Sequence, residues 1–360
     1  MDQNSGAALL EVKKPGLMAH ILVIRLSAMG DVGMTVPVLC AFTQQYPDIR
    51  ITVLTRGIYK PIFAPLPNVT VYEADLKHRH KGVFGLYRLS RELKKHGITA
   101  VADLHNVVRS IVLRQFFILG GIVCAKIDKG RAEKKALTAS KNKVFAQLKT
   151  THQRYVDVFA NLGYAFDLTK VVLPSKRVLT HSTRDLVGRD GKKWIGIAPF
   201  AAFEGKRYPL EMMQTVVAML EPNATYKVFL FGGGAHEVKL LEQFSIATGA
   251  INTAGKLGFA EELALISNLD VMVSMDSGNA HLAAMYGIPT VTLWGVTHPF
   301  AGFYPFGQDI NNALLADRSK FPLLPTSVYG NKMPEGYEKA IASIEPEKVY
   351  QKITEILDPR

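Results

Sequence analysis

The segment from Val271 to Pro299 constrains the fold of this 360-residue chain more than any other. A β-rich run ends at Asp276, the polar turn Asp-Ser-Gly-Asn follows, and an apolar helix over residues 280–286 stops at Gly287 before a second β-rich run. Strand, helix and strand in such quick succession predict a βαβ unit of a parallel sheet. With Asp276 as the expected helix cap, the turn could present backbone N–H groups to a phosphate. An ordinary βαβ connection explains the same residues equally well.

The same alternation recurs along the rest of the chain. In the first half we expect strands over residues 21–26, 50–55, 69–73, 100–104 and 122–127 and helices over 32–45, 84–95 and 154–162. In the second half we expect strands over 194–198 and 227–231 and helices over 210–220, 235–248 and 346–357. The polar stretch 180–193 has little periodicity and is predicted to connect the halves. This pattern predicts two α/β domains, each with a parallel sheet flanked by helices, and a cleft between them.

The positive charge of the chain is confined to its first half. The net charge is +12, yet residues 1–174 hold 25 Lys and Arg against 12 Asp and Glu, whereas the remainder holds 18 against 19. The cations are densest between Lys77 and Lys149. We expect this half to meet an anionic partner, which could be a phosphorylated substrate, an acidic membrane surface or a nucleic acid. A solvated basic surface without a partner is the remaining alternative.

The two cysteines and the apolar runs bear on where the chain works. Cys40 and Cys124 stand in apolar surroundings without a CxxC motif, so neither a disulfide framework nor a structural zinc site is indicated. The apolar runs are of strand length, and the N-terminal residues lack the basic start and apolar run of a signal peptide. These features predict a soluble, cytoplasmic protein.

Ligands of open parallel sheets bind beyond the carboxyl ends of strands, so the turns after the predicted strands are the candidate sites. In the turn Arg25 to Val32, Gly30 permits a tight bend, and Asp31 is either a helix N-cap or a carboxylate aimed into the cleft. One glycine does not make the three-glycine fingerprint of a dinucleotide site.

Three turns of the second half are further candidates. Lys206 and Arg207 could neutralise a diphosphate or simply be exposed. The glycine-rich turn before Glu237 lacks the GxxxxGK[ST] phosphate loop, and Glu237 is either a ribose ligand or a first-turn carboxylate. His281 lies on the apolar helix, where a histidine is either a ligand or a core residue.

Several motifs in these turns have a fixed order and spacing. Arg-Leu-Ser-x-x-Gly-Asp-Val occupies residues 25–32 and is followed by Pro37, and Lys-Arg-Tyr-Pro occupies residues 206–209. Asp-Ser-Gly-x-x-His-Leu-Ala-Ala occupies residues 276–284 and is followed by Gly-x-Pro-Thr at 287–290 and Gly-x-Thr at 295–297. From about residue 21 to 357 the chain resembles glycosyltransferase family 9, the heptosyltransferases that extend the inner core of lipopolysaccharide with ADP-heptose.

The resemblance implies a GT-B architecture, in which two Rossmann-like domains with parallel sheets face each other across a cleft. Residues 19–175 would form the acceptor-binding domain and residues 176–340 the nucleotide-sugar-binding domain. Residues 1–18 have no counterpart and are expected to be a disordered extension. The helix within residues 341–360 would be free to pack back on the N-terminal domain.

The resemblance also implies roles for individual residues. Asp31 would be the general base that takes the proton of the acceptor hydroxyl. Lys206, with the N–H groups of Ser277 and Gly278, would stabilise charge on the ADP leaving group. The other implied donor-binding residues are Phe200, Ala201, Glu237, Leu257, Asp276 and His281. The implied acceptor-binding residues are Ser27, Met29, Gly30, Lys126, Lys129 and Arg131.

The activity implied is inverting transfer of a heptose from an ADP-sugar to an anionic inner-core glycolipid, at the inner face of the cytoplasmic membrane. The stretch from Lys126 to Lys149 is expected to engage this acceptor or anionic lipid. The sequence contains no DxD motif, so neither a metal nor another cofactor is expected. Two alternatives remain: a sugar-nucleotide epimerase of the same two-domain shape, which needs no acceptor, and a nucleic-acid-binding protein, for which the sequence shows no recognisable motif.

Overall fold

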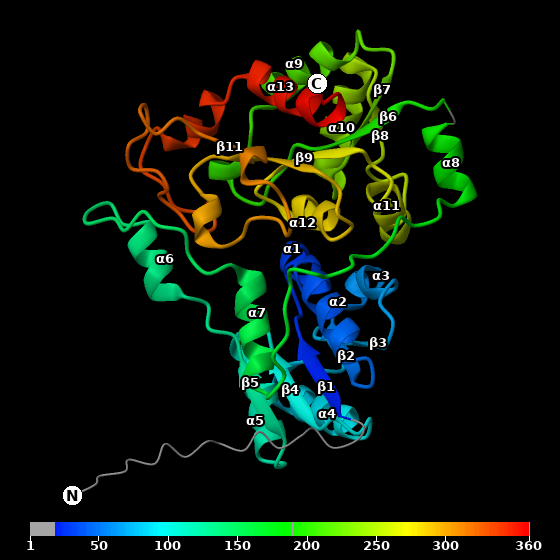
Figure 1. The fold of residues 1–360 in the computed structure, drawn as a ribbon, viewed down its shortest axis with the longest axis vertical. Coiled ribbons are helices and arrows are strands. Elements are labelled where there is room, and N and C mark those ends of the chain that lie inside the picture. The colour runs from blue at the N-terminus through cyan, green and yellow to red at the C-terminus, as the bar shows by residue number, and fades with distance from the viewer. Residues whose placement is uncertain (1–18, 189, 360) are drawn as a thin grey trace, which may run out of the picture.

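Two parallel β-sheets organise the chain, one in each of two α/β domains (Figure 1). The computed structural model describes residues 19–188 and 190–359. The extension expected over residues 1–18 therefore lies outside the described residues. The expected GT-B arrangement of two Rossmann-like sheets is the arrangement that the structure shows.

The first sheet has the strand order β3-β2-β1-β4-β5 and is parallel throughout. Its strands are β1 (His20–Ile24), β2 (Arg50–Thr55), β3 (Val69–Glu73), β4 (Ala100–Asp103) and β5 (Val123–Lys126). All residues of β1 are buried because helices cover both faces of the sheet. The strand order reverses at β1, which lies between β2 and β4, and ligands bind at such switch points.

The second sheet repeats this plan with the order β11-β10-β9-β6-β7-β8. Its strands are β6 (Lys193–Ala198), β7 (Tyr226–Leu230), β8 (Ile251–Asn252), β9 (Val271–Met275), β10 (Thr290–Trp294) and β11 (Ala313–Leu315). Its order reverses at β6, between β7 and β9. The turns after β1, β6 and β9 are therefore the places where both sheets can hold a ligand.

Helices cover each face of the first sheet with apolar side chains. On one face, α4 (Gly82–Lys94) and α5 (Val108–Ile118) bury Leu86, Leu89, Leu93, Leu113 and Phe117. The other face carries α2 (Thr35–Gln45), α3 (Lys60–Phe63) and α7 (Thr151–Ala160). The apolar cluster on this second face continues into α11 (Phe259–Ile266) and α12 (Gly278–Ala284) of the other domain. A shared apolar core thus joins the two domains.

The C-terminal helix α13 (Pro346–Leu357) packs on the second domain, and the expectation that it packs back on the first domain is corrected. Its residues Val349, Ile353 and Leu357 form one apolar stripe that is buried with α9 (Leu210–Leu220). Lys193 at the start of β6 also donates to the carbonyl of Leu357 at 2.6 Å. On the same side of the sheet lies α10 (Ala235–Thr248).

The connection between the domains lies earlier than the sequence suggested. Residues 180–193 contain a helix, α8 (His181–Val187), because Thr180 caps it by accepting from the N–H of Thr183. The chain crosses between the domains over residues 161–180, where Gln45 of α2 donates to the carbonyl of Asp167 at 2.8 Å. Arg177 then donates from its backbone N–H to Ser267 beside α11.

The sequence predicted neither a disulfide framework nor a membrane-spanning helix. Cys40 and Cys124 are free thiols, as predicted. No helix among the described residues is both long and apolar enough to cross a bilayer.

Candidate functional site

The two domains approach each other closely at the glycines of two strand-end turns. A Cβ atom on Gly30, in α1 (Met29–Gly33) after β1, would lie 3.1 Å from the Cα of Gly278 and 2.9 Å from Cδ2 of His281. A Cβ atom on Gly278, at the start of α12, would lie 2.6 Å from Cε of Met29. Only residues without a side chain allow two backbones to approach in this way. The motif glycines therefore set the distance between the domains.

A cavity of about 250 Å³, which we call the central cavity, opens beside this contact. The first domain contributes Asp31 to its lining, and the second contributes Lys206 and the turn that begins at Asp276. The remaining lining residues are Ala28, Gly30, Met34, Ala202, Phe203, Ser277, Gly278, His281, Phe303, Val328 and Tyr329. Residues from both halves of the sequence thus share one crevice.

A second cavity of about 190 Å³, which we call the basic cavity, adjoins the first. It is lined by Arg25, Ser27, Ala28, Asp31, His105, Ile127, Lys129, Lys134, Thr151, Arg154, Phe303 and Tyr329. Asp31, Ala28, Phe303 and Tyr329 line both cavities. Asp31 consequently lies on the boundary between them.

The carboxylate of Asp31 is held by a buried arginine. Nη2 of Arg25 lies 2.5 Å from Oδ2 of Asp31, and Nη1 donates to the carbonyl of Leu104 beyond β4 at 2.8 Å. The Arg25 side chain is 8% exposed and that of Asp31 29%. The N–H of Ala28 also donates to Oδ2 at 3.3 Å. The sequence left open whether Asp31 caps a helix or faces the cleft. The structure shows both, because Asp31 accepts a hydrogen bond at the start of α1 and also lines the central cavity.

Lys206 is fixed by close backbone contacts in the short helix η2 (Glu204–Lys206) that follows β6. The N–H of Val296 donates to the carbonyl of Gly205 at 2.9 Å. The stem of Lys206 packs over Gly330, where a Cβ atom would lie 2.5 Å from Cγ of the lysine. Nζ of Lys206 lies 3.4 Å from Oδ2 of Asp276, and both side chains are largely buried. The lysine is thus aimed at the turn between β9 and α12.

The pairing with Lys206 corrects the expected role of Asp276. The N-cap of α12 is Ser277, and neither residue makes a side-chain hydrogen bond to the first turn of the helix. The Ser277 hydroxyl instead lies 3.0 Å from that of Ser274. Asp276 precedes the N-cap position by one residue, and its carboxylate pairs with Lys206. The first turn of α12 therefore has no side-chain cap.

His281 lies on the cavity side of α12. It is 9% exposed, and burial lowers its pKa, which keeps the imidazole neutral near pH 7. Its Nδ1 atom is buried without a hydrogen-bond partner among the described residues. The atom could therefore accept or donate a hydrogen bond when the cavity is filled.

Cations crowd the basic cavity. Lys134, in α6 (Arg131–Leu137), is 6% exposed, and its Nζ lies 4.0 Å from the ring centre of Phe303 in the second domain. Burial and the charge of Arg154 lower the pKa of Lys134 to about 8. Burial, with Arg25 and Lys129, lowers the pKa of His105 to about 4, so this ring is neutral. The wall formed by Arg25, Lys129 and Lys134 suits an anionic group.

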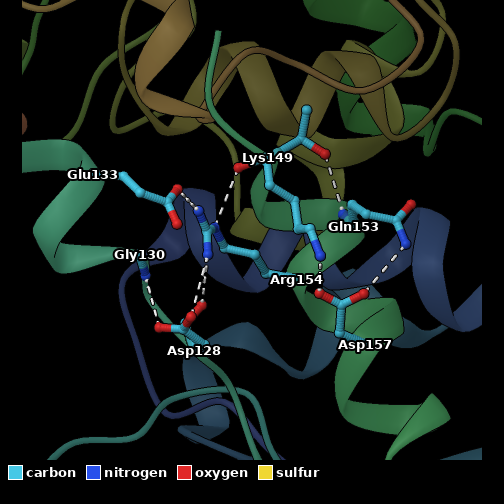
Figure 2. Close-up of polar contacts among 8 residues, drawn as sticks. Asp128, Gly130, Glu133, Lys149, Gln153, Arg154 and Asp157 are labelled. Atoms are coloured by element: carbon cyan, nitrogen blue, oxygen red, sulfur yellow. Dashed lines mark hydrogen bonds and ion pairs between the residues drawn. The ribbon is translucent and has the colours of Figure 1, made fainter. Parts of the chain in front are cut away.

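Arg154 of α7 braces this wall (Figure 2). Its Nη2 lies 2.7 Å from Oε2 of Glu133, and its Nε donates to the carbonyl of Lys149 at 3.2 Å. Nη1 reaches the carbonyl of Asp128 at 3.3 Å. Arg154 therefore ties both ends of the loop that carries α6 to α7.

The structure brings part of the predicted donor set together. Lys206, Asp276, Ser277, Gly278 and His281 line the central cavity, whereas Phe200, Ala201, Glu237 and Leu257 lie outside its lining. Glu237 accepts a hydrogen bond from the N–H of Gly233 at 2.8 Å. It therefore acts as a carboxylate in the first turn of α10, one of the two roles that the sequence left open. Leu257 packs against the shared apolar core. Ala202 and Phe203 line the cavity where Phe200 and Ala201 were expected.

The predicted acceptor set is also divided. Ser27 and Lys129 line the basic cavity, Gly30 lines the central cavity, and Met29 faces Gly278. Lys126 and Arg131 are exposed and lie outside both linings. The ligand-binding roles of all these residues stay predictions.

Sequence reasoning missed several lining residues. Arg25 belongs to the first motif, which was a usable signal, and Lys134 belongs to the basic stretch. His105, Arg154, Phe303 and Tyr329 carried no local signal, because only the packing of distant segments brings them to the cavities. Within the described ranges, no group of three or more His, Cys, Asp or Glu side chains is placed to hold a metal ion. Independence from metal stays a prediction.

Comparison with known proteins decides the family. The family model described as "Glycosyltransferase family 9 (heptosyltransferase)" matches residues 86–325. This chain belongs to glycosyltransferase family 9. The prediction of a glycosyltransferase is confirmed, and the epimerase and nucleic-acid-binding alternatives are set aside.

Individual relatives agree with this family. Lipooligosaccharide heptosyltransferase 2 of Haemophilus influenzae is 26% identical over 367 residues, which cover 94% of this chain and 99% of the relative. The structure of a family 9 glycosyl transferase from Veillonella parvula has a TM-score of 0.73 at 20% identity and covers 94% of this chain and 97% of that one. The structure of Escherichia coli ADP-heptose lps heptosyltransferase II has a TM-score of 0.65 at 18% identity, with 94% and 98% covered. These structural likenesses confirm the predicted fold.

Proposed function

We propose that this glycosyltransferase moves a heptose from ADP-heptose to an anionic sugar of the lipopolysaccharide inner core, with inversion and without a metal ion. The position of Asp31 carries the proposal. It lines the central cavity opposite Lys206 and also lines the cation-rich basic cavity. A donor in the central cavity and an acceptor in the basic cavity would therefore meet at this carboxylate. The names of the relatives support the choice of heptose, ADP and a lipopolysaccharide or lipooligosaccharide acceptor.

Asp31 would act as the general base. The acceptor hydroxyl attacks the anomeric carbon, a new C–O bond forms as the bond to the β-phosphate breaks, and the hydroxyl proton passes to Asp31. Arg25 and the N–H of Ala28 both bind Oδ2, which leaves Oδ1 to receive the proton. Because Arg25 is itself anchored on Leu104, the carboxylate is held in place before substrate arrives.

Lys206 would stabilise the leaving group. The departing ADP gains negative charge on its β-phosphate, and a cation already held in a water-poor site counters that charge at little cost of reorganisation. Asp276 holds Nζ at 3.4 Å, a distance from which the lysine can turn toward a diphosphate. The N–H groups of Ser277 and Gly278, in the same lining, would add hydrogen bonds to the phosphate.

The basic cavity would bind the acceptor. Inner-core sugars carry carboxylates and phosphates, and Arg25, Lys129 and Lys134 offer three cations around the place where Asp31 meets the acceptor hydroxyl. Because that acceptor is attached to a lipid, we also propose that the protein works in the cytoplasm against the inner face of the cytoplasmic membrane.

Replacement of Asp31 tests the mechanism. In Asp31→Ala we expect kcat to fall by about two orders of magnitude or more, because the general base is lost, while the dissociation constant of ADP stays near that of the wild type. ADP release with ADP-heptose and a deacylated inner-core glycan measures the first, and calorimetry the second. Asp48→Asn, which changes an exposed carboxylate of the same domain, is the control. Undiminished transfer by Asp31→Ala would remove Asp31 from the mechanism.

The donor class has a separate test. We expect ADP-sugars to raise the unfolding temperature more than UDP- or GDP-sugars, since a ligand bound only by the folded state stabilises it. Protection by UDP-sugars alone would refute the assignment of ADP. An isomerised nucleotide sugar formed without any acceptor would instead point to an epimerase.

A further inference from the structure

Helices α4 and α5 expose an unusual share of apolar side chains. Among the described residues eighteen large hydrophobic side chains are exposed, and eight of them lie on α4, on α5 and the residue after it, and on β5. These eight are Val83, Phe84, Tyr87, Val108, Ile111, Ile118, Leu119 and Val123, and we call their surface the α4–α5 face. Phe84 is 90% exposed. Exposed apolar side chains gathered on neighbouring elements mark an interaction surface.

These side chains are not needed for the core of the domain. The inward side of the same helices already buries Leu86, Leu89 and Phe117 against the first sheet. The two helices are joined side by side, because the rings of Tyr87 and Phe116 lie 5.4 Å apart and Lys94 donates to the carbonyl of Phe116 at 2.7 Å. Figure 1 shows both helices on the first domain, away from the second domain. The face is therefore a platform that the other described residues leave uncovered.

Cations border the platform. Lys77, Lys81, Arg88, Arg91 and Arg109 are exposed, and none of them forms an ion pair with a described residue. The nearby carboxylate Glu92 is already bound by Arg79 and His80. The face consequently combines apolar side chains with uncompensated positive charge.

The platform also adjoins the proposed acceptor site. Asp103, the last residue of β4, accepts from the N–H groups of His105 and Asn106 and lies 2.6 Å from Nη1 of Arg114 on α5. His105 lines the basic cavity, and α5 begins at Val108. One short loop thus connects the exposed start of α5 with the wall of that cavity.

We propose that the α4–α5 face docks this protein on an anionic lipid bilayer, an inference that rests on the proposed lipid-linked acceptor. Apolar side chains such as Phe84 enter the boundary between head groups and acyl chains, and the surrounding arginines and lysines meet anionic head groups. The contact places the basic cavity near the bilayer surface, where the sugars of a membrane-embedded acceptor begin.

Charge separates this partner from the alternatives. A symmetric dimer through the same face would set its unpaired cations against identical cations, which repel. Binding to a phosphate backbone would use the cations but not the aliphatic side chains of Val108 and Leu119.

This face is separate from the stretch Lys126 to Lys149 that the sequence suggested, whose contact with the acceptor or anionic lipid stays a prediction. Within the stretch from Lys126 to Lys149, Lys134 is buried over Phe303, Lys143 donates to the carbonyl of Pro325 at 2.6 Å, and Lys149 pairs with Asp157. Lys126, Arg131, Lys135 and Lys141 of the same stretch are exposed, so only part of its charge is engaged within the protein.

Vesicle sedimentation tests the face. We expect the wild type to bind vesicles of phosphatidylcholine and phosphatidylglycerol, and to bind pure phosphatidylcholine vesicles far less, with binding that weakens as salt rises. Phe84→Ser, and separately the double change Arg88→Glu and Arg91→Glu, should each lower the partition coefficient about tenfold or more. Ile246→Ser and Lys239→Glu, exposed positions on α10, are the matched controls and should bind as the wild type does.

Two acceptors separate this proposal from the proposed function. Phe84→Ser should slow transfer to an acceptor embedded in vesicles and leave transfer to the deacylated, water-soluble glycan unchanged. No transfer to either acceptor, with vesicle binding intact, would refute the proposed function and leave the docking face standing.

Other outcomes overturn the docking proposal itself. Wild-type vesicle binding by both variants would do so. So would a dimer in sedimentation velocity that Phe84→Ser dissociates, or RNA binding that the double arginine variant loses, if vesicle binding stays unaltered. A circular dichroism spectrum and melting temperature equal to those of the wild type would confirm that each variant is folded.

Discussion

Replacement of Gly30 by alanine is the sharpest test of how the two domains form one site. The new Cβ atom would lie 3.1 Å from the Cα of Gly278, which is backbone, and 2.9 Å from Cδ2 of His281, whereas ordinary contact begins at 3.4 Å. The turn after β1 must therefore move away from α12 by a few tenths of an ångström. Strain of this kind costs about 1–3 kcal/mol, and the greater helix propensity of alanine returns about 0.5–1 kcal/mol.

The net loss of stability should be small, but the loss of activity should not. Asp31 follows Gly30 directly, so the added methyl group should move the proposed base away from the side of the cavity that holds Lys206. A displacement of about 1 Å can cost about a hundredfold in rate, so a smaller one should lower kcat about tenfold. Affinity for ADP should change little, because Lys206 and Asp276 stay in place.

Gly33→Ala in the same helix is the matched control. Its Cβ atom would meet Cδ2 of Leu282 at 3.3 Å, the flexible end of a side chain that can give way. Turnover of a deacylated acceptor and ADP calorimetry, run on both variants, provide the comparison. If Gly30→Ala turned over as fast as Gly33→Ala, Asp31 and Lys206 would not depend on this approach and the shared-site argument would fail.

Three further predictions concern charge. Lys206→Ala should raise the dissociation constant of ADP about tenfold by calorimetry, because a charge-assisted contact to phosphate is lost; an unchanged constant would refute its role. Burial lowers the pKa of His152 to about 3, so below pH 6.5 the unfolded chain takes up a proton that the native ring refuses. Stability should fall from pH 6.5 to 4 by about 1.4 kcal/mol per pH unit from this group, and urea unfolding of His152→Leu should show a shallower fall unless the prediction is wrong. Because Lys134 loses its charge near pH 8, the acceptor KM should rise from pH 7 to 9 and be flatter in Lys134→Met; equal profiles would count against it.

Much of the fold could be predicted because local signals and tertiary packing agree. Helix α10 spans the predicted residues because Gly249, with a φ of +71°, ends it in the left-handed region. Strands β2 and β3 also have the predicted bounds. Helix α5 was missed for a physical reason: it is rich in β-branched and aromatic residues, and its exposed Val108 and Ile118 blur the helical period.

The site was predictable only where one turn supplies it. Asp31 and Gly278 could be placed in a cleft because each follows a strand at a switch point. The neighbours of a turn depend on how two domains dock, which no local pattern records. Ala202 and Phe203 line the central cavity where Phe200 and Ala201 were expected, and Lys134 is buried by Phe303, a residue of the other domain.

The division of charge between the two halves has a structural meaning that sequence counting could not reveal. The loop that carries α6 belongs to the basic half, yet it packs on the second domain, where Leu148 donates to the carbonyl of Phe300 at 2.9 Å and the side chain of Arg318 stacks over Phe145 at 3.9 Å. Its cations therefore fall into two groups. Lys134 is held between the domains beside the proposed acceptor, whereas Lys126, Arg131, Lys135 and Lys141 are exposed. Because Phe303 and Tyr329 of the second domain line both cavities, the proposed acceptor cavity is complete only when the two domains are packed together.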